Sequence, residues 1–213
     1  PTDALPSSRT EFEEALDHSL AQWGIEARRG VWLQIPPDKG ELIQVAIQKG
    51  FYFHSAEKTH LLLAKWLPAA RNEANTLPAG ASHTVGVGCI VMQPNGRILV
   101  LTEKNGPTRG RHFWKYPTGL VDEGEDIRQA AMREVFEETG IQTEFSSILG
   151  FRQSHKGPFG KSNMFFICLL RPLNTDIRKD STEVDECKWM DVEEFSKMTH
   201  YTPASIYHAI NLV

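Results

Sequence analysis

The chain has 213 residues, of which 40% are hydrophobic, and its formal net charge is −4 at pH 7. This length allows one large or two small domains, and the hydrophobic content is sufficient for packed cores. The negative charge gives no reason to expect a long nucleic acid as a partner, because such binding usually requires a basic stripe. Small anionic substrates need only a few local cations and are compatible with this composition.

Three cysteines, Cys89, Cys168 and Cys187, lie within apolar segments. Their odd number indicates buried thiols rather than disulfides, which predicts an intracellular, reducing compartment. No stretch approaches the roughly 20 apolar residues of a membrane helix, so we expect no membrane partner. Because Pro1 is not an initiating residue, the cytosol and an organelle such as a mitochondrion or plastid both stay open.

An amphipathic helix opens the chain at about residue 9. Thr10 and Glu13 have the spacing of a capping box, which marks a helix start. The apolar residues recur at helical spacing on one face: Phe12, Leu16, Leu20 and Trp23. We therefore expect this helix to pack against a core of its own.

The segments that follow alternate between strand and helix patterns. Three strands and one helix are predicted, the strands at 30–35, 51–54 and 60–67 and the helix at 41–49. Residues 68–82 are rich in Ala, Asn, Pro and Gly without apolar periodicity, which predicts a linker with a boundary near Gly80. The chain would then contain a small α/β domain at 9–78 and a second domain at 83–213.

The second domain begins with two apolar runs, 85–92 and 97–102, on either side of Gln93-Pro94-Asn95-Gly96. Asn-Gly is a strong turn signal between paired strands, so we expect a hairpin. Three later elements are predicted: strands at 164–170 and 187–190, and a helix at 192–198 that Asp191 and Glu194 would cap.

Between these elements lies the most informative segment, GLVDEGEDIRQAAMREVFEETGI at 119–141. At roughly 100° per residue, Glu134, Glu137 and Glu138 fall on one face of a helix. Like charges at this spacing destabilise a helix by a few tenths of a kcal/mol per pair. A bound divalent cation would compensate for that repulsion.

The alternative is an ordinary solvated acidic face, which most helices with such a run would have. Ile127, Ala130 and Ala131 argue against it, because they project to the same side as Glu134 and Glu138. The acids then extend a face that looks inward, so we expect them to line a cleft.

The same segment resembles the motif of the Nudix hydrolases, with matching residues at Gly119, Glu125, Arg133, Glu134, Glu137, Glu138 and Gly140. The resemblance implies an α/β/α sandwich with a mixed sheet. It also implies that Glu134, Glu137, Glu138 and Gly119 form the metal site. Arg133 would orient the carboxylates, and Glu125 would hold Arg133 and the loop, although simple capping of the helix start is the alternative for Glu125.

Oxygen donors without a His or Cys cluster indicate Mg²⁺ or Mn²⁺ rather than Zn²⁺. Such an ion can bridge the phosphates of a diphosphate and lower the pKa of a bound water, which predicts hydrolysis of a phosphoanhydride. The general base is either a glutamate of the motif or one of three acids expected in a later loop, Glu183, Asp185 and Glu186. Exposed loop acids are an equally good interpretation of those three.

Segments before the motif extend the resemblance. GVWLQIP, GFYFHSAE and ASHTVGVG are similar to the acetyltransferase-like region of Nudix proteins encoded antisense to a growth-factor gene, and of their plant relatives. Acetyl transfer itself is not expected, because 36–40 offers one glycine and two prolines where coenzyme A would need a glycine-rich loop. WKYPTG at 114–119 resembles the approach to the Nudix helix, but Thr118 replaces the usual glycine.

Substrate choice depends on weaker signals. FRQSHKGPFGKS at 151–162 matches part of the segment that marks NADH-cleaving Nudix enzymes, with Gly157 in place of the central aromatic. A loop after the Nudix helix often lines the site, so we predict that Arg152 and Phe159 contact the nucleotide, and we add Glu183 and Glu186 to the substrate-binding set. Basic residues near the expected cleft could also be solvated surface charges: Arg109, Arg111, Lys115, Arg152, Lys156 and Lys161.

The leading hypothesis is a Mg²⁺-dependent hydrolase that cleaves a nucleoside diphosphate linked to another moiety, such as ADP-ribose or NADH. Water would be the nucleophile. The alternative is a structural or binding subunit of a larger assembly with little or no turnover. A homodimer is also open.

Overall fold

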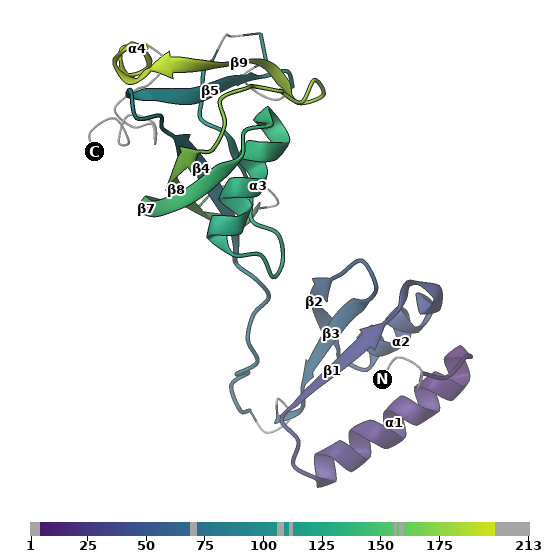
Figure 1. The fold of residues 1–213 in the computed structure, drawn as a ribbon. Coiled ribbons are helices and arrows are strands. Elements are labelled where there is room, and N and C mark those ends of the chain that lie inside the picture. Colours follow the sequence, from purple (N-terminus) through teal and green to yellow (C-terminus); the bar gives the residue numbers. More distant parts are fainter. Residues whose placement is uncertain are drawn as a thin grey trace. The chain divides into compact units, whose positions relative to one another are not determined.

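The computed structural model describes residues 5–68, 72–105, 109–110, 113–155, 157 and 160–198. The chain divides into two compact units, Pro1–Ala81 and Ser82–Val213, each with a hydrophobic core (Figure 1). Within the described ranges, no helix is both long enough and apolar enough to cross a membrane.

The first unit is a three-stranded antiparallel sheet with two helices, in the strand order β1-β3-β2. Its main elements are α1 Arg9–Ile25, β1 Gly30–Ile35, α2 Leu42–Gln48, β2 Tyr52–Ala56 and β3 Leu61–Trp66. A short 3₁₀ turn, Pro37–Lys39, lies between β1 and α2. Phe12 of α1, Val45 of α2 and Leu63 of β3 meet in one buried cluster, so the small α/β fold expected here is present.

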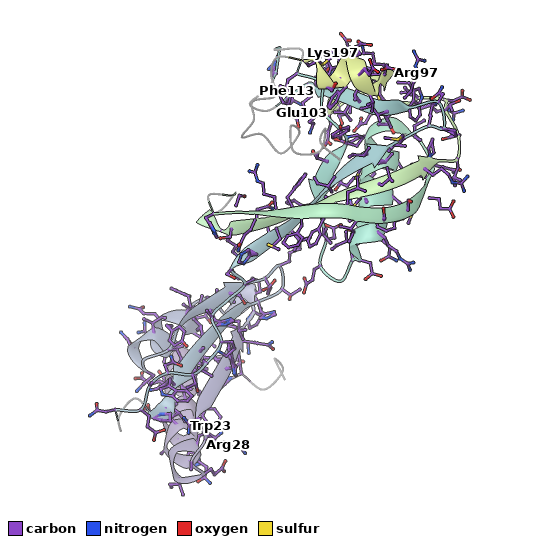
Figure 2. All side chains as sticks on the ribbon, turned by 90° about the vertical axis from the view of Figure 1, so that its left-hand side faces the viewer. Trp23, Arg28, Arg97, Glu103, Phe113 and Lys197 are labelled. Atoms are coloured by element: carbon purple, nitrogen blue, oxygen red, sulfur yellow. The ribbon has the colours of Figure 1, made fainter. Side chains whose placement is uncertain are left out.

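The start of α1 differs from the prediction. Ser8, not Thr10, is the N-cap, and its side chain accepts a hydrogen bond from the Glu11 N–H at 3.2 Å. Ser8 and Glu11 have the same spacing as Thr10 and Glu13, so the earlier of two equivalent pairs begins the helix. Of the predicted apolar face, Phe12 and Leu16 are buried, while Leu20 and Trp23 are partly buried against the same core; Trp23 lies toward the C-terminal end of α1 (Figure 2).

The segment predicted as a linker forms hydrogen bonds with the first unit. Trp66 Nε1 donates to the Glu73 carbonyl at 3.1 Å, and Asn75 Nδ2 donates to the Tyr52 hydroxyl at 3.2 Å. His54 Nε2 lies 3.1 Å from the Pro78 carbonyl oxygen. The described part of this segment therefore belongs to the first unit, which ends at Ala81.

The second unit contains a four-stranded mixed sheet, in the order β6-β4-β8-β7, and a two-stranded ribbon, β5-β9. Its strands are β4 His83–Val91, β5 Arg97–Glu103, β6 Thr118–Leu120, β7 Thr143–Ser154, β8 Ser162–Pro172 and β9 Val184–Asp191. Its helices are α3 Ile127–Thr139 and α4 Val192–Ser196. Strands β4 and β8 run parallel, and the other pairs are antiparallel. The predicted mixed α/β architecture is confirmed.

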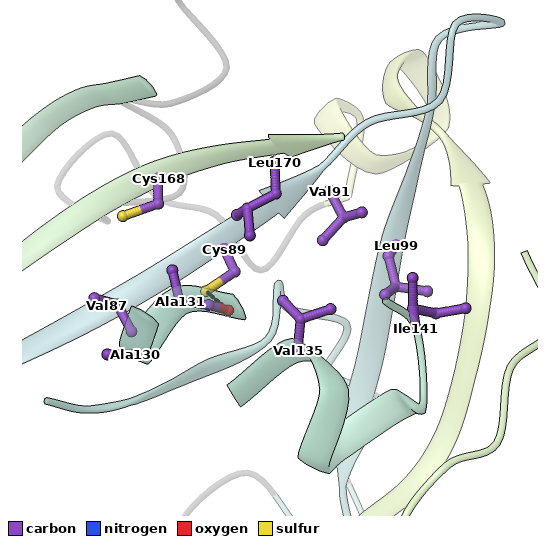
Figure 3. Packing of buried hydrophobic residues seen from close by; sticks show 10 residues of the cluster. All are labelled: Val87, Cys89, Val91, Leu99, Ala130, Ala131, Val135, Ile141, Cys168 and Leu170. Atoms are coloured by element: carbon purple, nitrogen blue, oxygen red, sulfur yellow. Dashed lines mark hydrogen bonds between the residues drawn. The ribbon is translucent and has the colours of Figure 1, made fainter. Parts of the chain in front are cut away.

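Helix α3 lies across one face of the four-stranded sheet (Figure 1). Its residues Ala131 and Val135 are fully buried with Cys89 and Cys168 of the sheet, and the Cys89 thiol donates to the Ala131 carbonyl oxygen at 3.4 Å (Figure 3). On the other face, β8 packs against the β5-β9 ribbon and α4 through a cluster that includes Phe195. The sheet is thus covered on both sides.

The hairpin predicted between β4 and β5 is wrong beyond its turn. Gln93 N–H donates to the Arg97 carbonyl at 2.8 Å and Gly96 has φ 80°, as a tight turn requires. After one isolated bridge between Met92 and Ile98, however, β5 leaves to pair with β9. Strand β5 pairs with β9 from Arg97 to Glu103, whereas β4 pairs with β8 along its whole length and with β6 at Gly86–Gly88.

Two further boundaries differ from the predictions. Strand β9 begins at Val184, so Asp185 and Glu186 lie in a strand and only Glu183 lies in the preceding turn. Strand β7 was not predicted at all, and its last four residues come from the segment that we expected to be a loop. Irregularities in its pairing between Phe145 and Ser147 and between Ile148 and Gly150 break the two-residue alternation that reveals a strand.

Candidate active site

Helix α3 is fixed at both ends and along its inner face. Asp126 is the N-cap residue, and its N–H donates to Gln129 Oε1 at 3.1 Å. Gly140 ends the helix in the left-handed conformation, with φ 70°. Ala130 and Ala131 are fully buried, which confirms that this face looks inward. Glu134 and Glu138, which project to the same side of α3, therefore lie close to the sheet.

Arg133 gathers three carboxylates around its guanidinium group. It binds both oxygens of Glu125 at 2.8 Å, and it donates to Glu134 Oε1 at 2.9 Å and to Glu137 Oε2 at 3.0 Å. A further bond to the Leu120 carbonyl oxygen, at 3.0 Å, ties Arg133 to β6. The Arg133 hydrogen bonds lower the pKa of Glu125, so Glu125 serves as an anchor for Arg133 and does not cap α3.

Glu134 occupies the space beside Gly119. A Cβ atom on Gly119 would lie 1.8 Å from Glu134 Cδ, which no structure could accommodate without moving one of the two. The Glu134 side chain is only 15% exposed, and this burial raises the pKa of its carboxyl group against the opposing effect of Arg133. Gly119 therefore has a clear structural role, which is to leave room for this carboxylate.

Glu138 is the most buried acid of the site, with 8% of its surface exposed. Its Oε2 accepts a hydrogen bond from the Thr118 N–H at 3.2 Å. Burial raises the pKa of Glu138 to about 8, and the charges of Glu134 and Glu183 act in the same direction, while Lys115 opposes them. Glu138 is thus held near the sheet, where the charge of Lys115 offsets only part of the effect of burial on its pKa.

Of the later acids, Glu183 is the one whose charge helps to raise the pKa of Glu138. The Glu183 carbonyl accepts from the Lys104 N–H at 2.8 Å, next to the end of β5, and its charge acts on Glu138. Asp185 and Glu186 are exposed on β9, where the Glu186 N–H donates to the Thr102 hydroxyl at 3.1 Å. From the sequence alone, these three acids were equivalent candidates for the general base.

The structure does not bring Arg152 to the acids. Arg152 lies in β7, opposite Phe165, at one edge of the four-stranded sheet. Gly119 lies in β6, at the opposite edge. The role of Arg152 in nucleotide contact stays a prediction. Three other residues proposed for the cleft lie outside the described residues: Phe159, Arg111 and Lys156.

The comparisons with known proteins agree with this geometry. A family model described as the NUDIX domain matches residues 82–210, which include the complete motif. The chain belongs to the Nudix family. A second model, described as a Nudix hydrolase domain, matches residues 1–67 of this Nudix protein.

Relatives of this Nudix protein match it over most of its length. Nudix hydrolase 2 of Arabidopsis thaliana is 45% identical over 89% of this chain and 67% of its own length. Nucleoside diphosphate-linked moiety X motif 6 of Homo sapiens is 41% identical over 90% of this chain and 60% of its own. A MutT Nudix hydrolase structure from Burkholderia pseudomallei is 24% identical, with a TM-score of 0.49 over 62% of this chain and 97% of that one. The chain thus spans about two thirds or less of these two relatives.

Nudix hydrolases generally use divalent metal cations, and the residues here fit that use in part. Among the described residues, no three His, Cys, Asp or Glu side chains are grouped as a complete metal site. Glu137 is 57% exposed and, like Glu134, accepts a hydrogen bond from Arg133 Nη1, so the convergence of all three carboxylates on one cation stays a prediction. Burial raises the pKa of the other two carboxyl groups, Glu134 and Glu138. Two buried oxygen donors with excess negative charge suit a hard divalent cation.

The raised pKa of Glu138 predicts that this Nudix protein loses stability as the pH rises. The carboxyl group titrates near 4.5 when solvated and near 8 when folded. The folded state binds the extra proton between those values, so the stabilisation is complete below about pH 4.5 and is lost as the pH rises through about 8. The loss should be at most about 5 kcal/mol.

Urea unfolding between pH 4.5 and 9 in the presence of EDTA would measure this loss. The wild type should lose more unfolding free energy over that range than Glu138→Gln, in which the titrating group is absent. Saturating Mg²⁺ should reduce the difference, because a cation that binds the ionised carboxylate stabilises the folded state. If the unfolding free energies of the two proteins changed with pH in parallel, Glu138 would not be the group responsible for the loss of stability.

Proposed function

We propose that this protein hydrolyses the diphosphate of a nucleoside diphosphate linked to another moiety, of the ADP-ribose or NADH type, with Mg²⁺ or Mn²⁺. The observation that carries the proposal is the pair of acids, Glu134 and Glu138, buried against Gly119 and Thr118. The name of the human relative, nucleoside diphosphate-linked moiety X motif 6, supports the substrate class. Water attack would give two monophosphates.

When bound, the cation would polarise the diphosphate and lower the pKa of the attacking water. The side chains of Glu134 and Glu138 would hold it, and Arg133 would keep Glu134 in place through the 2.9 Å contact to Oε1. Glu125 serves this purpose indirectly, because it fixes two nitrogens of Arg133. The exposed Glu137 also helps to hold Arg133, because it accepts a hydrogen bond from the same guanidinium group.

Two carboxylates are suited to accept a proton from the attacking water. Glu138 has its pKa raised to about 8 by burial, which is near the pH at which a general base is most effective. Glu183 is close enough for its charge to act on Glu138. The pH dependence of kcat/KM for the wild type and Glu183→Gln would distinguish the two candidates. If Glu183 is the base, the fall of kcat/KM at low pH should be absent from Glu183→Gln, and if Glu138 is the base, that fall should be retained.

The direct test is a panel of ADP-ribose, NADH and other nucleoside diphosphate conjugates, each incubated with Mg²⁺ or Mn²⁺. We expect turnover of at least one compound to AMP, or the corresponding nucleotide, and a second monophosphate, identified by chromatography. EDTA should reduce the rate to background and excess Mg²⁺ should restore it. Folded protein without cation-dependent turnover of any compound would refute the proposal.

The same experiment addresses the alternative, a binding subunit with little turnover. That function predicts a folded protein that is inactive on the whole panel and that elutes with a stoichiometric partner in size-exclusion chromatography. Whether the chain forms a homodimer also stays a prediction, which the elution volume of the purified protein would test.

A further inference from the structure

Lys115 is a buried lysine that the proposed chemistry does not use. Its side chain is 9% exposed. The ammonium group lies 2.5 Å from Glu103 Oε1 and donates to the Thr118 hydroxyl at 2.8 Å. Lysine is rarely buried unless its charge is paired, so this position has a specific set of partners. The solvated surface charge considered from the sequence is therefore wrong for Lys115.

The partners of Lys115 belong to two different sheets. Glu103 is the last residue of β5, in the two-stranded ribbon, and Thr118 is the first residue of β6, in the four-stranded sheet; Glu103 is labelled in Figure 2. The main chain of Lys115 is fixed to β5 by two hydrogen bonds with Leu101, both 2.9 Å long. The ammonium group thus joins the end of the ribbon to the strand that carries Gly119.

Thr118 connects this junction to the acids. Its N–H donates to Glu138 Oε2 at 3.2 Å, while its hydroxyl accepts from Lys115. Thr118 stands where the Nudix pattern has glycine, which would supply the N–H but no hydroxyl. The hydroxyl therefore gives Thr118 an additional anchor, the hydrogen bond from Lys115. The backbone N–H of the same residue holds Glu138, the most buried acid of the site.

We infer that Lys115 is a positioning residue, which acts through the Thr118 hydroxyl to fix the backbone N–H that holds Glu138. The inference deepens the proposed function, because Glu138 is one of the two acids expected to bind the cation. Partners of this kind around a metal site commonly affect metal affinity or activity by about 10-fold to 100-fold. A lysine that only stabilised the fold would lower the melting temperature and leave the cation affinity unchanged.

The test uses Thr118→Val, which keeps the shape of the side chain and removes the hydroxyl. Calorimetric titration with Mn²⁺ alone should show an affinity about 10-fold lower than that of the wild type. Thr118→Ser retains the hydroxyl and should bind Mn²⁺ within about twofold of the wild type. If the panel identifies a substrate, kcat should fall by a similar factor in Thr118→Val while KM changes less.

Thr84→Val is the matched control, because the Thr84 hydroxyl also forms hydrogen bonds within the four-stranded sheet, where its partners are Ser162 and Asn163 of β8. It should leave the Mn²⁺ affinity unchanged even if it lowers the melting temperature. Mn²⁺ binding requires no turnover. The titration therefore tests the role of Lys115 even if the protein hydrolyses no compound of the panel.

A double-mutant cycle with Lys115→Met shows whether the two residues act through one contact. Lys115→Met also removes a positive charge, so the comparison is the effect of Thr118→Val in each background. In Lys115→Met, Thr118→Val should change the Mn²⁺ affinity by less than about twofold. Equal losses in both backgrounds, or unchanged Mn²⁺ affinity in Thr118→Val, would overturn the inference. Should Lys115→Met fail to fold, the Thr118 variants decide alone.

Discussion

Replacing Glu138 with glutamine should reduce kcat by about 10³-fold on any substrate that the panel identifies. Glutamine keeps the shape of the side chain and can still accept from the Thr118 N–H, but it cannot ionise to bind a cation or accept a proton. Because burial penalises the charged carboxylate, the variant should be at least as stable as the wild type at pH 8. Steady-state kinetics and urea unfolding would measure the two effects.

The control for this change is Glu144→Gln, which removes an exposed carboxylate that pairs with Arg171. It should leave kcat and the unfolding free energy close to wild-type values, because exposed pairs contribute little. If Glu138→Gln kept more than a tenth of the wild-type kcat, Glu138 could not have the role proposed here.

Gly119→Ala should reduce activity by about 100-fold, although it adds only one methyl group. The new Cβ would fall 1.8 Å from Glu134 Cδ, so the carboxylate must leave its position or β6 must move. Overpacking of this kind costs about 1–3 kcal/mol of unfolding free energy. Kinetics, Mn²⁺ titration and urea unfolding on the same preparation would separate loss of the site from loss of the fold.

Gly150→Ala is the matched control on the same sheet. Among the described residues, no heavy atom outside its immediate chain neighbours lies within 4 Å of the Cβ that this change would add. The variant should therefore retain both activity and cation affinity. Equal behaviour of the Gly119 and Gly150 variants would show that Glu134 does not need the space beside Gly119.

The helix of the site could be predicted from the sequence because its signals are local. The apolar spacing of Ile127, Ala130 and Ala131 defines an inner face within two turns, and the structure buries both alanines. The same spacing could not predict that Glu137 is largely exposed and pairs with Arg133. That outcome depends on Arg133, which Glu125 and Leu120 also hold from outside the helix.

Contacts between distant segments set the limits of prediction elsewhere. The turn before β5 was predicted, but the strand pairing was wrong, because β5 pairs with the distant strand β9 from Arg97 to Glu103. Lys115 gave no signal in the sequence that distinguished it from a surface charge, because its partners come from β5 and β6. Thr118 gave only an indirect signal, as the position that departs from the family pattern.

The close contact between α3 and the sheet has a consequence for how the site could change. Ala130 and Ala131 are the smallest chiral side chains, and both are fully buried where the helix meets β4 and β8. The height of the helix above the strands therefore depends on these two methyl groups together with Val135, and the same height determines how far Glu134 and Glu138 reach. A bulkier residue at either alanine would alter the reach of the acids without touching any ligand, so the hydrophobic interior and the chemistry of this protein cannot vary independently.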